Sequence, residues 1–275
     1  MREHDVFIHF NISLRALWPL LFIRRPFIAT HHGFYVTDKF GHRDWRERLK
    51  LCLARHAAAN IAASRAIAQA IGVNCHIIPN PYDDALFHTR NEVPRGKELI
   101  FVGRLVSDKG ADLLIEAISI LKQRDLTPEL TIVGDGPERS RLDRLTTDLG
   151  LKNQINFTGA RSQAEVAEIL RQHEILVVPS LWNEPFGVVA LEGIASGCLV
   201  VGSDGGGLPE AIGPCGLTFP NGDGQALAEQ LAVLLTNRAL FDQYRAQVET
   251  HLAHHRPQAV ARRYRDVIAT AVNEF

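Results

Sequence analysis

Two glutamates in the segment 179–197 have the spacing and surroundings of a functional site. Glu184 and Glu192 are separated by seven residues, and Pro185-Phe186-Gly187 opens a predicted helix whose first N–H groups lack an intrahelical partner. Those N–H groups and the positive end of the helix dipole favour a bound phosphate. Glu192 lies among apolar residues, so its carboxylate needs a partner from the protein or a ligand. Taken alone, the pair is also compatible with hydrolysis by two carboxylates.

The elements around this segment predict a complete Rossmann-like domain. From residue 98 onward, runs of three to five apolar residues alternate with helical patterns, as is typical of parallel βαβ units buried on both faces. The six predicted strands are 99–102, 130–133, 155–157, 175–178, 199–201 and 217–219. The predicted helices are 111–121, 138–149, 164–170, 186–195, 208–212 and 226–235.

Polar residues and glycines follow most of these strands directly. They are Gly103-Arg104, Gly134-Asp135-Gly136, Thr158-Gly159, Pro179-Ser180 and Gly202-Ser203. In open parallel sheets, ligands bind outside the carboxyl ends of the strands. The sequence therefore predicts that the ligand-binding edge of the domain is formed by these loops.

The first 92 residues predict only part of a second Rossmann-like domain. The strand candidates are 6–10, 28–30, 60–63 and 76–79, with a helix near 14–23, a basic amphipathic segment at 45–58 and a short helix capped by Ser64. We predict an amino-terminal domain over 1–92 and a ligand-binding domain over 93–255. Residues 256–275 are predicted to form a helix that packs back toward the front domain.

Composition narrows the class of protein. The chain has 275 residues, of which 46% are hydrophobic and 22% charged, and a net charge of −1, which gives no overall attraction to nucleic acid. The four cysteines form no Cys-x-x-Cys pair, which predicts free, buried thiols and a cytoplasmic protein. No run reaches the roughly 18–20 apolar residues of a spanning helix. Arg15 interrupts the one candidate signal-peptide core.

Four motifs in order carry a family resemblance. They are Gly103 to Gly110, Ile132 to Pro137, Glu184 to Glu192 and Gly205 to Glu210. Together they resemble the carboxyl-terminal domain of family 4 retaining glycosyltransferases, which have the GT-B fold. Ile77 to Asp83 is similar to the strand that leads into that family's interdomain crossing, with Pro81 where glycine is usual.

The resemblance implies a nucleotide-diphosphate sugar as donor, with Arg104 and Lys109 on the diphosphate. Where no metal neutralises the leaving phosphate, fixed cations and N–H dipoles must do so. A guanidinium can grip two phosphate oxygens and an ammonium supplies a point charge. The alternative is that the two side chains are surface charges or part of an ion pair at a helix end. Asp135 is in no Asp-x-Asp motif, so we expect no metal and no other cofactor.

The resemblance also assigns the other donor contacts. It implies that Glu192 binds the ribose and Glu184 the transferred sugar, while the N–H groups of Phe186, Gly187 and Val188 face sugar and diphosphate. Gly103, Gly134 and Asp135 are implied nucleotide contacts, and the 205–207 glycines let the backbone approach the donor. The alternatives are a dipole-stabilised carboxylate for Glu184 and a plain flexible turn for the glycines.

In the front domain, the resemblance implies that His32 faces the donor sugar, the alternative being a structural histidine. Thr30 and His31 are weaker candidates. The implied reaction is attack by the acceptor hydroxyl on the face from which the phosphate departs, with a phosphate oxygen taking the proton. A covalent step on Glu184 is the competing route.

The chain lacks the opening strand and glycine-rich loop of the family's front domain. The predicted explanations are a truncated chain, a second chain that completes the domain, or a remnant that binds nucleotide without transfer. We expect a glycan or lipid-linked acceptor, and the basic stretch 40–50 with Arg24 and Arg25 could rest on an anionic membrane; a solvated helix face is the alternative. A nucleotide-sugar-binding subunit and a sugar-nucleotide epimerase are the competing functions.

Overall fold

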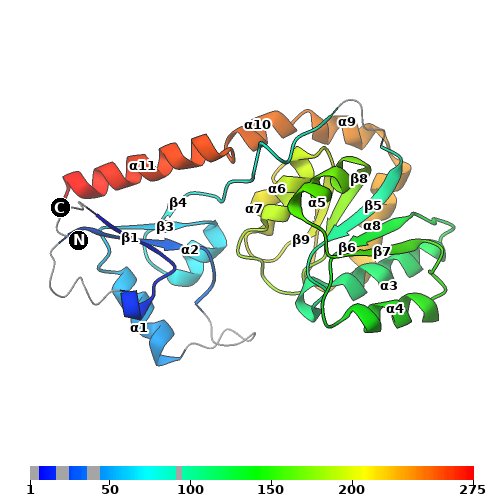
Figure 1. Cartoon of the computed structure of the whole chain (residues 1–275), viewed down its shortest axis with the longest axis horizontal. Coiled ribbons are helices and arrows are strands. Elements are labelled where there is room, and N and C mark those ends of the chain that lie inside the picture. The colour runs from blue at the N-terminus through cyan, green and yellow to red at the C-terminus, as the bar shows by residue number, and fades with distance from the viewer. Residues whose placement is uncertain (1–5, 17–24, 36–43, 91–94) are drawn as a thin grey trace. The chain divides into compact units, whose positions relative to one another are not determined.

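The computed structural model describes residues 6–16, 25–35, 44–90 and 95–275. The chain divides into two compact units, of which unit 1 comprises residues 1–81 and 257–275 and unit 2 comprises residues 82–256. Each unit contains one sheet in which all paired strands are parallel (Figure 1). The α/β class with parallel sheets, predicted from the alternation of apolar runs and helices, is confirmed.

Unit 2 is built on a six-stranded sheet with the order β10-β9-β8-β5-β6-β7. Its strands are β5 Lys97–Val102, β6 Leu130–Val133, β7 Ile155–Gly159, β8 His173–Val178, β9 Leu199–Ser203 and β10 Gly216–Phe219. The chain runs outward from β5 to β7, returns to place β8 on the other side of β5, and then runs outward to β10. The strand order therefore reverses between β5 and β8, and such a switch point is where open parallel sheets bind ligands.

Helices cover both faces of this sheet (Figure 1). Leu99 and Phe101 of β5 pack with α3, α4, α8 and α9, whereas Ile100 packs with α5, α6, α7 and α10. The helices are α3 Ala111–Lys122, α4 Arg139–Asp148, α5 Gln163–Arg171, α6 Val188–Ala195, α7 Leu208–Ile212, α8 Gly224–Thr236, α9 Ala239–Arg245 and α10 Val248–Ala253, with the 3-10 turn η3 Ser107–Lys109 before α3. The two-sided burial explains why the strand sequences are continuously apolar.

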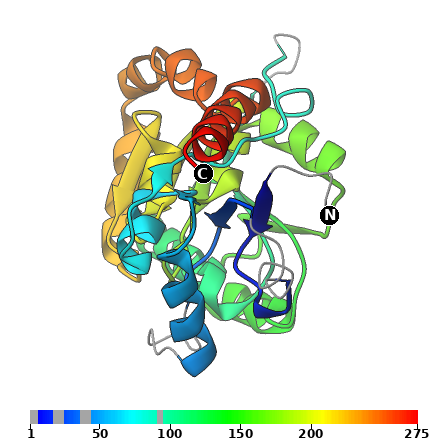
Figure 2. The same cartoon turned by 90° about the vertical axis from the view of Figure 1, so that its left-hand side faces the viewer.

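Unit 1 has a four-stranded sheet with the order β1-β2-β3-β4. Phe27 and Ala29 of β2 pack with α1 and α2 on one face, and Ile28 packs with α11 on the other (Figures 1 and 2). The elements are β1 Phe7–Phe10, η1 Leu14–Ala16, β2 Phe27–His31, α1 Trp45–Ala54, β3 Ala59–Ala62, α2 Arg65–Ile71, β4 His76–Ile77 and α11 Pro257–Asn273. Ser64 caps α2 by accepting the Ile67 N–H, as predicted.

The end of the chain therefore returns to unit 1. Val260 and Ala271 of α11 are buried beside Ile61, and the Arg263 guanidinium donates to the Ile77 carbonyl. Unit 1 ends at Pro81, before the predicted boundary at Glu92. The physical reason is that Tyr82 and Phe87 are buried in the core of unit 2, so the connecting segment belongs to that unit.

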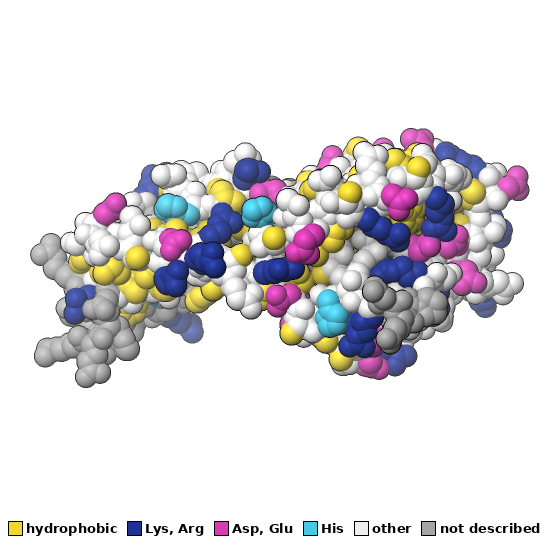
Figure 3. Space-filling view, turned by 90° about the horizontal axis from the view of Figure 1, so that it is seen from above, with side chains coloured by type: hydrophobic (Ala, Val, Ile, Leu, Met, Phe, Trp, Pro, Cys, Tyr) yellow, Lys and Arg dark blue, Asp and Glu magenta, His cyan; other side chains and the backbone are white. Residues whose placement is uncertain are grey.

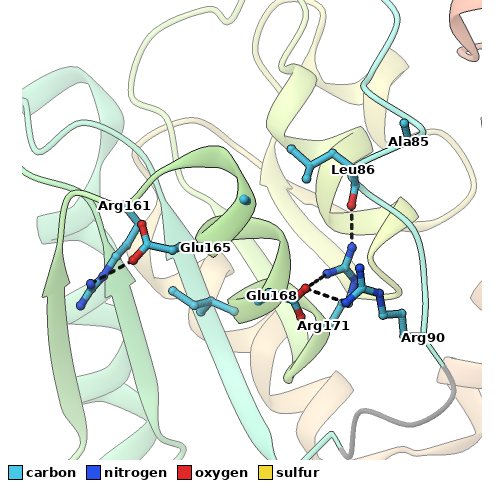
Figure 4. A pocket seen from close by; sticks show the side chains of 9 residues that line it. Ala85, Leu86, Arg90, Arg161, Glu165, Glu168 and Arg171 are labelled. Atoms are coloured by element: carbon cyan, nitrogen blue, oxygen red, sulfur yellow. Dashed lines mark hydrogen bonds and ion pairs between the residues drawn. The ribbon is translucent and has the colours of Figure 1, made fainter.

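A buried arginine fixes this connecting segment to α5. Arg171 is 1% exposed and donates to the carbonyls of His88 (2.8 Å) and Leu86 (2.5 Å), and it pairs with Glu168 at 2.7 Å (Figure 4). Arg90 reaches the same Glu168 oxygen at 2.8 Å. The pocket beside these residues measures about 470 Å³, but no residue predicted to bind the donor lines it.

Several predictions concern features of the surface. The four cysteines are free, but Cys52 on the outer side of α1 is exposed and Cys75 is only partly buried, which corrects the prediction of burial for these two. No described helix is long and apolar enough to cross a membrane. Of the predicted 14–23 helix, residues 14–16 form η1. Residues 17–23, Arg24 and residues 40–43 of the basic stretch lie outside the described residues. Figure 3 shows Lys and Arg side chains interspersed with Asp and Glu over unit 2 on the face it draws.

We expect Arg171→Met to lower the free energy of unfolding by about 2 to 4 kcal/mol, because two carbonyls and a carboxylate lose their buried donor. Urea unfolding followed by circular dichroism measures the change. The control is Arg161→Met, which removes an exposed pair with Glu165 near the same helix and should cost far less than the Arg171 substitution. Equal losses in the two variants would contradict the role of Arg171.

Candidate active site at the carboxyl ends of the strands

The loops that follow β5 and β8 meet at the switch point of unit 2. The Leu181 N–H, in the loop after β8, donates to the Asp108 carbonyl in η3 at 2.9 Å. This backbone hydrogen bond joins the segment that carries Arg104 and Lys109 to the segment that carries Glu184. The predicted phosphate-binding and sugar-binding residues therefore lie in neighbouring loops.

Lys109 and Glu184 form an ion pair with 2.6 Å between Nζ and Oε1. The same carboxylate oxygen accepts a hydrogen bond from the Ser180 hydroxyl, also at 2.6 Å, and the Glu184 residue is only 7% exposed. Two donors thus hold Oε1, while Oε2 has no hydrogen bond within the described residues. An ion pair was the alternative interpretation of Lys109 in the sequence. The partner in this pair, however, is Glu184, which was itself predicted to belong to the site.

Ser180 was not predicted as a functional residue. The available signal in the sequence was its place shortly after β8. Its hydrogen bond to Glu184 spans four residues of an irregular loop, and no sequence pattern predicts such a contact. Since Ser180 is 1% exposed, its hydroxyl has a fixed position. It therefore orients the Glu184 carboxylate together with Lys109.

Arg104 differs from Lys109 in having no partner for its side chain. It follows β5 and Gly103, its side chain is exposed, and no hydrogen bond or ion pair holds its guanidinium within the parts of the chain that the structure describes. A guanidinium in this state is available to an anion. Arg104 is therefore the cation of the site that a phosphate can engage without breaking an existing contact.

The backbones after β5 and β6 lie in direct contact. Gly134 has φ 143°, and a Cβ on this residue would overlap the Gly103 carbonyl oxygen. Leu105 N–H donates to the Asp135 carbonyl at 2.9 Å, which fixes the two loops together. Asp135 itself is exposed and its carboxylate accepts the Gly136 N–H at 2.7 Å. A side chain at 134 would separate the loops, so the glycine is required here.

The start of α6 presents free N–H groups. Gly187 stands at the N-cap with φ 94° and offers no side-chain cap. Among the described residues, no hydrogen-bond acceptor engages the N–H groups of Phe186, Gly187 or Val188, while the Phe186 ring is buried in the core. The expectation of unpaired donors at this helix start is met, and such donors form a site for an anion.

The carboxylate of Glu192 needs a hydrogen-bonding partner, as its position in the sequence indicated. It lies on α6 between the buried Leu191 and Gly193, and no hydrogen bond or ion pair to its carboxylate occurs in the described structure. Burial raises the pKa of Glu192, and the negative charge of Asp83 raises it further. Both effects disfavour the ionised carboxylate, so a ligand that donates hydrogen bonds would relieve them.

The glycine run 205–207 lies against the backbone of Glu184. Gly207 N–H donates to the Glu184 carbonyl at 2.7 Å, and a Cβ on Gly206 would overlap that same oxygen. Gly206, with φ 71°, also forms a bridge to Glu184. These glycines therefore support the Glu184 loop.

The two adjacent histidines of unit 1 have different surroundings. His31 is fully buried between Tyr35 (2.8 Å) and Asn60 (3.0 Å), and burial lowers the pKa of its imidazole, as befits a structural residue. His32 bonds Asn80 through Nδ1 at 2.9 Å and stacks on Phe10, but its buried Nε2 has no partner among the described residues. Of the two, His32 is the one with an unpaired ring nitrogen in the described structure.

A metal site was not predicted. In the described ranges, no three His, Cys, Asp or Glu side chains form a group suited to a metal ion. The donors assembled in unit 2 are instead ammonium, guanidinium and backbone N–H groups, which complement an anion.

Known proteins share both the sequence pattern and the fold. The chain is 37% identical over 166 residues to the D-inositol 3-phosphate glycosyltransferase of Corynebacterium efficiens, covering 56% of this chain and 38% of that protein. It is 29% identical over 247 residues to the phosphatidyl-myo-inositol mannosyltransferase of Mycobacterium leprae, covering 85% and 64%. HepE from Anabaena, solved with UDP, has a TM-score of 0.84 at 21% identity, covering 98% and 79%.

The chain spans less than two thirds of the length of the curated relatives that it matches. The match to HepE covers 98% of this chain, whereas the family pattern described as "Glycosyl transferases group 1" matches residues 84–251. That range is more than half of the chain and contains all the site residues of unit 2. The chain belongs to the group 1 family of glycosyl transferases.

Proposed function

We propose that this chain transfers a hexose-type sugar from a nucleotide-diphosphate sugar to an acceptor, with retention of anomeric configuration and without a metal ion. The observation that carries the proposal is the gathering, at the carboxyl ends of β5 and β8, of Arg104, Lys109 and the unpaired N–H groups at the start of α6. These groups complement the charge of a departing nucleoside diphosphate. The UDP and UDP-glucose named for HepE supply the first donors to test.

In the proposed reaction, the bond between the anomeric carbon and the phosphate oxygen breaks with its electrons passing to the phosphate. The acceptor oxygen forms the new bond on the same face, and its proton passes to the departing phosphate oxygen. Arg104 and the N–H groups of Phe186 to Val188 stabilise the charge that develops on the diphosphate. Lys109 shares its charge between Glu184 and the phosphate.

The carboxylates take different parts in this proposal. Glu184 Oε2 accepts a hydroxyl of the transferred sugar while Oε1 stays with Lys109 and Ser180. Glu192 accepts the ribose hydroxyls, which gives its carboxylate the donors that the protein does not supply. Gly103, Gly134 and Asp135 contact the nucleotide in this proposal, and the role of His32 at the donor sugar stays a prediction.

The acceptor is proposed to be a glycan or a lipid-linked molecule, handled by a cytoplasmic protein that touches the inner face of the membrane. One relative is named a phosphatidyl-myo-inositol mannosyltransferase, and the lipid in that name is the reason for including a lipid-linked acceptor. Residues 44–50 are the described part of the basic stretch, and in it Lys50 pairs with Glu47 at 2.7 Å. Arg46 and Arg48 have no ion pair within the described residues. These arginines are the part that would meet anionic lipid.

A second candidate is a nucleotide-sugar-binding subunit that is inactive without a partner chain. The observation that favours it is the coverage, because the relatives contain sequence that this chain does not match. Both candidates have the same donor site, so both are expected to bind nucleotide. They differ in turnover, which is expected of the transferase and not of the subunit alone.

We expect one nucleoside diphosphate among UDP, GDP and ADP, or its sugar conjugate, to raise Tm by roughly 5 to 10 °C at 100 times its Kd. Differential scanning fluorimetry measures the shift, and transfer and donor hydrolysis are then assayed with and without EDTA. Binding with turnover in EDTA supports the metal-independent transferase, and binding without turnover supports the subunit. No shift with any nucleotide contradicts both.

Replacing Arg104 by Met should lower kcat/KM for transfer by roughly 10² to 10³-fold, because one preorganised cation is lost from the leaving phosphate. Tm without ligand should not change, since the guanidinium has no partner to lose. The matched control is Arg124→Met, an exposed arginine after α3, which should leave both kcat/KM and Tm unchanged. Equal activity of the two variants would remove Arg104 from the site.

We expect Glu192→Gln to raise the ligand-free Tm at pH 7 by roughly 2 °C and to abolish much of the nucleotide-induced shift. The folded-state pKa of Glu192 lies above its value of 4.5 in the unfolded chain, so its ionisation costs stability as pH rises above 4.5. The gain from the substitution should therefore shrink as pH falls toward 4.5. Glu116→Gln, on the exposed side of α3, is the control. A lower Tm at pH 7 would show that the protein already satisfies Glu192.

A further inference from the structure

An indole is exposed beside the Lys109–Glu184 pair. Trp182 is 39% exposed and its neighbour Leu181 is 40% exposed, in the loop that follows β8. The Trp182 ring centroid lies 5.9 Å from Lys109 Nζ. Exposing two large apolar side chains next to a polar site costs free energy, and such patches mark binding sites.

The loop that carries this indole is held in place at several points. Leu181 N–H donates to the Asp108 carbonyl at 2.9 Å, and Asn221 Nδ2 donates to the Trp182 carbonyl at 3.4 Å. Two residues on, Glu184 is fixed by Gly207. These hydrogen bonds hold the loop that carries the exposed ring. A ligand would therefore bind without having to order this loop.

Polar groups with unused hydrogen-bonding capacity lie next to this loop. Asn221 Oδ1 is buried without a partner in the described structure, and the Asn183 side chain is exposed without one. A Cβ on Gly205 would lie 2.6 Å from Asn183 Oδ1 and 2.7 Å from Asn221 Oδ1, so the two amides approach the same point. Asp204 accepts the Asn221 N–H through Oδ1 at 3.3 Å.

We infer that Trp182, with Asn183, Asn221 and Asp204, forms a subsite for a pyranose ring, an inference that rests on the proposed function. The C–H bonds on one face of a pyranose carry partial positive charge and complement the negative face of an aromatic ring. The hydroxyls at the ring edge need donors and acceptors, which the amides and the carboxylate supply. An apolar platform bordered by such groups fits a sugar.

The strand order separates this subsite from the nucleotide contacts. Trp182, Asp204 and Asn221 stand in the loops after β8, β9 and β10, on one side of β5, whereas Gly134 and Asp135 follow β6 on the other side. The pyranose belongs either to the donor sugar or to the acceptor, since both carry the same ring chemistry.

The test uses the full chain with Trp18→Phe and Trp45→Phe, so that Trp182 is the one remaining tryptophan of the three. Its emission is titrated with methyl α-glucopyranoside, methyl α-mannopyranoside and glycerol, and with UDP, GDP, ADP and their glucose conjugates. We expect a saturable change with a pyranoside or a sugar conjugate, and none with glycerol. A larger change with a conjugate than with its bare diphosphate assigns the donor sugar, and a pyranoside response at saturating conjugate assigns the acceptor.

The matching variants are Trp182→Phe and Trp182→Ala, with Trp45→Ala as control because Trp45 is exposed on α1 in unit 1. Trp182→Ala should raise the KM of the sugar-bearing substrate roughly 10-fold, and Trp182→Phe should recover most of it, because the phenyl ring keeps an aromatic face.

Two outcomes overturn the inference. One is an unchanged emission with every pyranoside and conjugate, and the other is an equal change with a bare diphosphate and its conjugate together with no change with any pyranoside. If a nucleotide still raises Tm in either case, the proposed function stands without this subsite. If no nucleotide raises Tm, the proposed function itself fails, whatever the pyranosides do.

Discussion

The ion pair between Lys109 and Glu184 is the interaction on which the site depends. A carboxylate that is 7% exposed needs strong donors, and Lys109 and Ser180 supply them from the two strands on either side of the switch point. The pair also sets where the glycine run 205–207 can lie, because that run hydrogen-bonds the backbone of Glu184. Three loops from separate βα units are thus aligned around one carboxylate.

What surrounds this satisfied centre is a set of groups that the protein leaves without partners. The guanidinium of Arg104, the N–H groups before α6 and the carboxylate of Glu192 all lack contacts in the described structure, and burial raises the pKa of Glu192. Natural sites accept such costs in stability where a ligand later removes them. The contrast between Glu184, which is held through Oε1, and Glu192, whose carboxylate has no hydrogen bond in the described structure, is therefore informative: the first carboxylate is positioned in advance, and the second needs a donor.

The sequence predicted the fold better than it predicted the contacts. The apolar runs gave all six strands of unit 2, because a strand buried on both faces has to be continuously apolar. The pairing of Lys109 with Glu184 was not predictable, since the two residues lie 75 positions apart and no periodicity links them. The boundary at Pro81 was missed for a similar reason, because the burial of Tyr82 and Phe87 depends on helices far along the chain. A lone tryptophan in a loop likewise gives no sign of its exposure.

The charge arrangement is consistent with the proposal that one site holds both ends of a nucleotide sugar. Glu184 offsets the charge of Lys109, so in the proposed function Arg104 and the helix N–H groups supply the positive potential that attracts a diphosphate. When a phosphate oxygen approaches Lys109, its ammonium can serve both anions, because it has three donors and Glu184 takes only one. Glu184 then keeps its orientation through Ser180 and offers Oε2 to a hydroxyl. In the proposed function, phosphate binding and sugar positioning are thereby coupled through a single ammonium group.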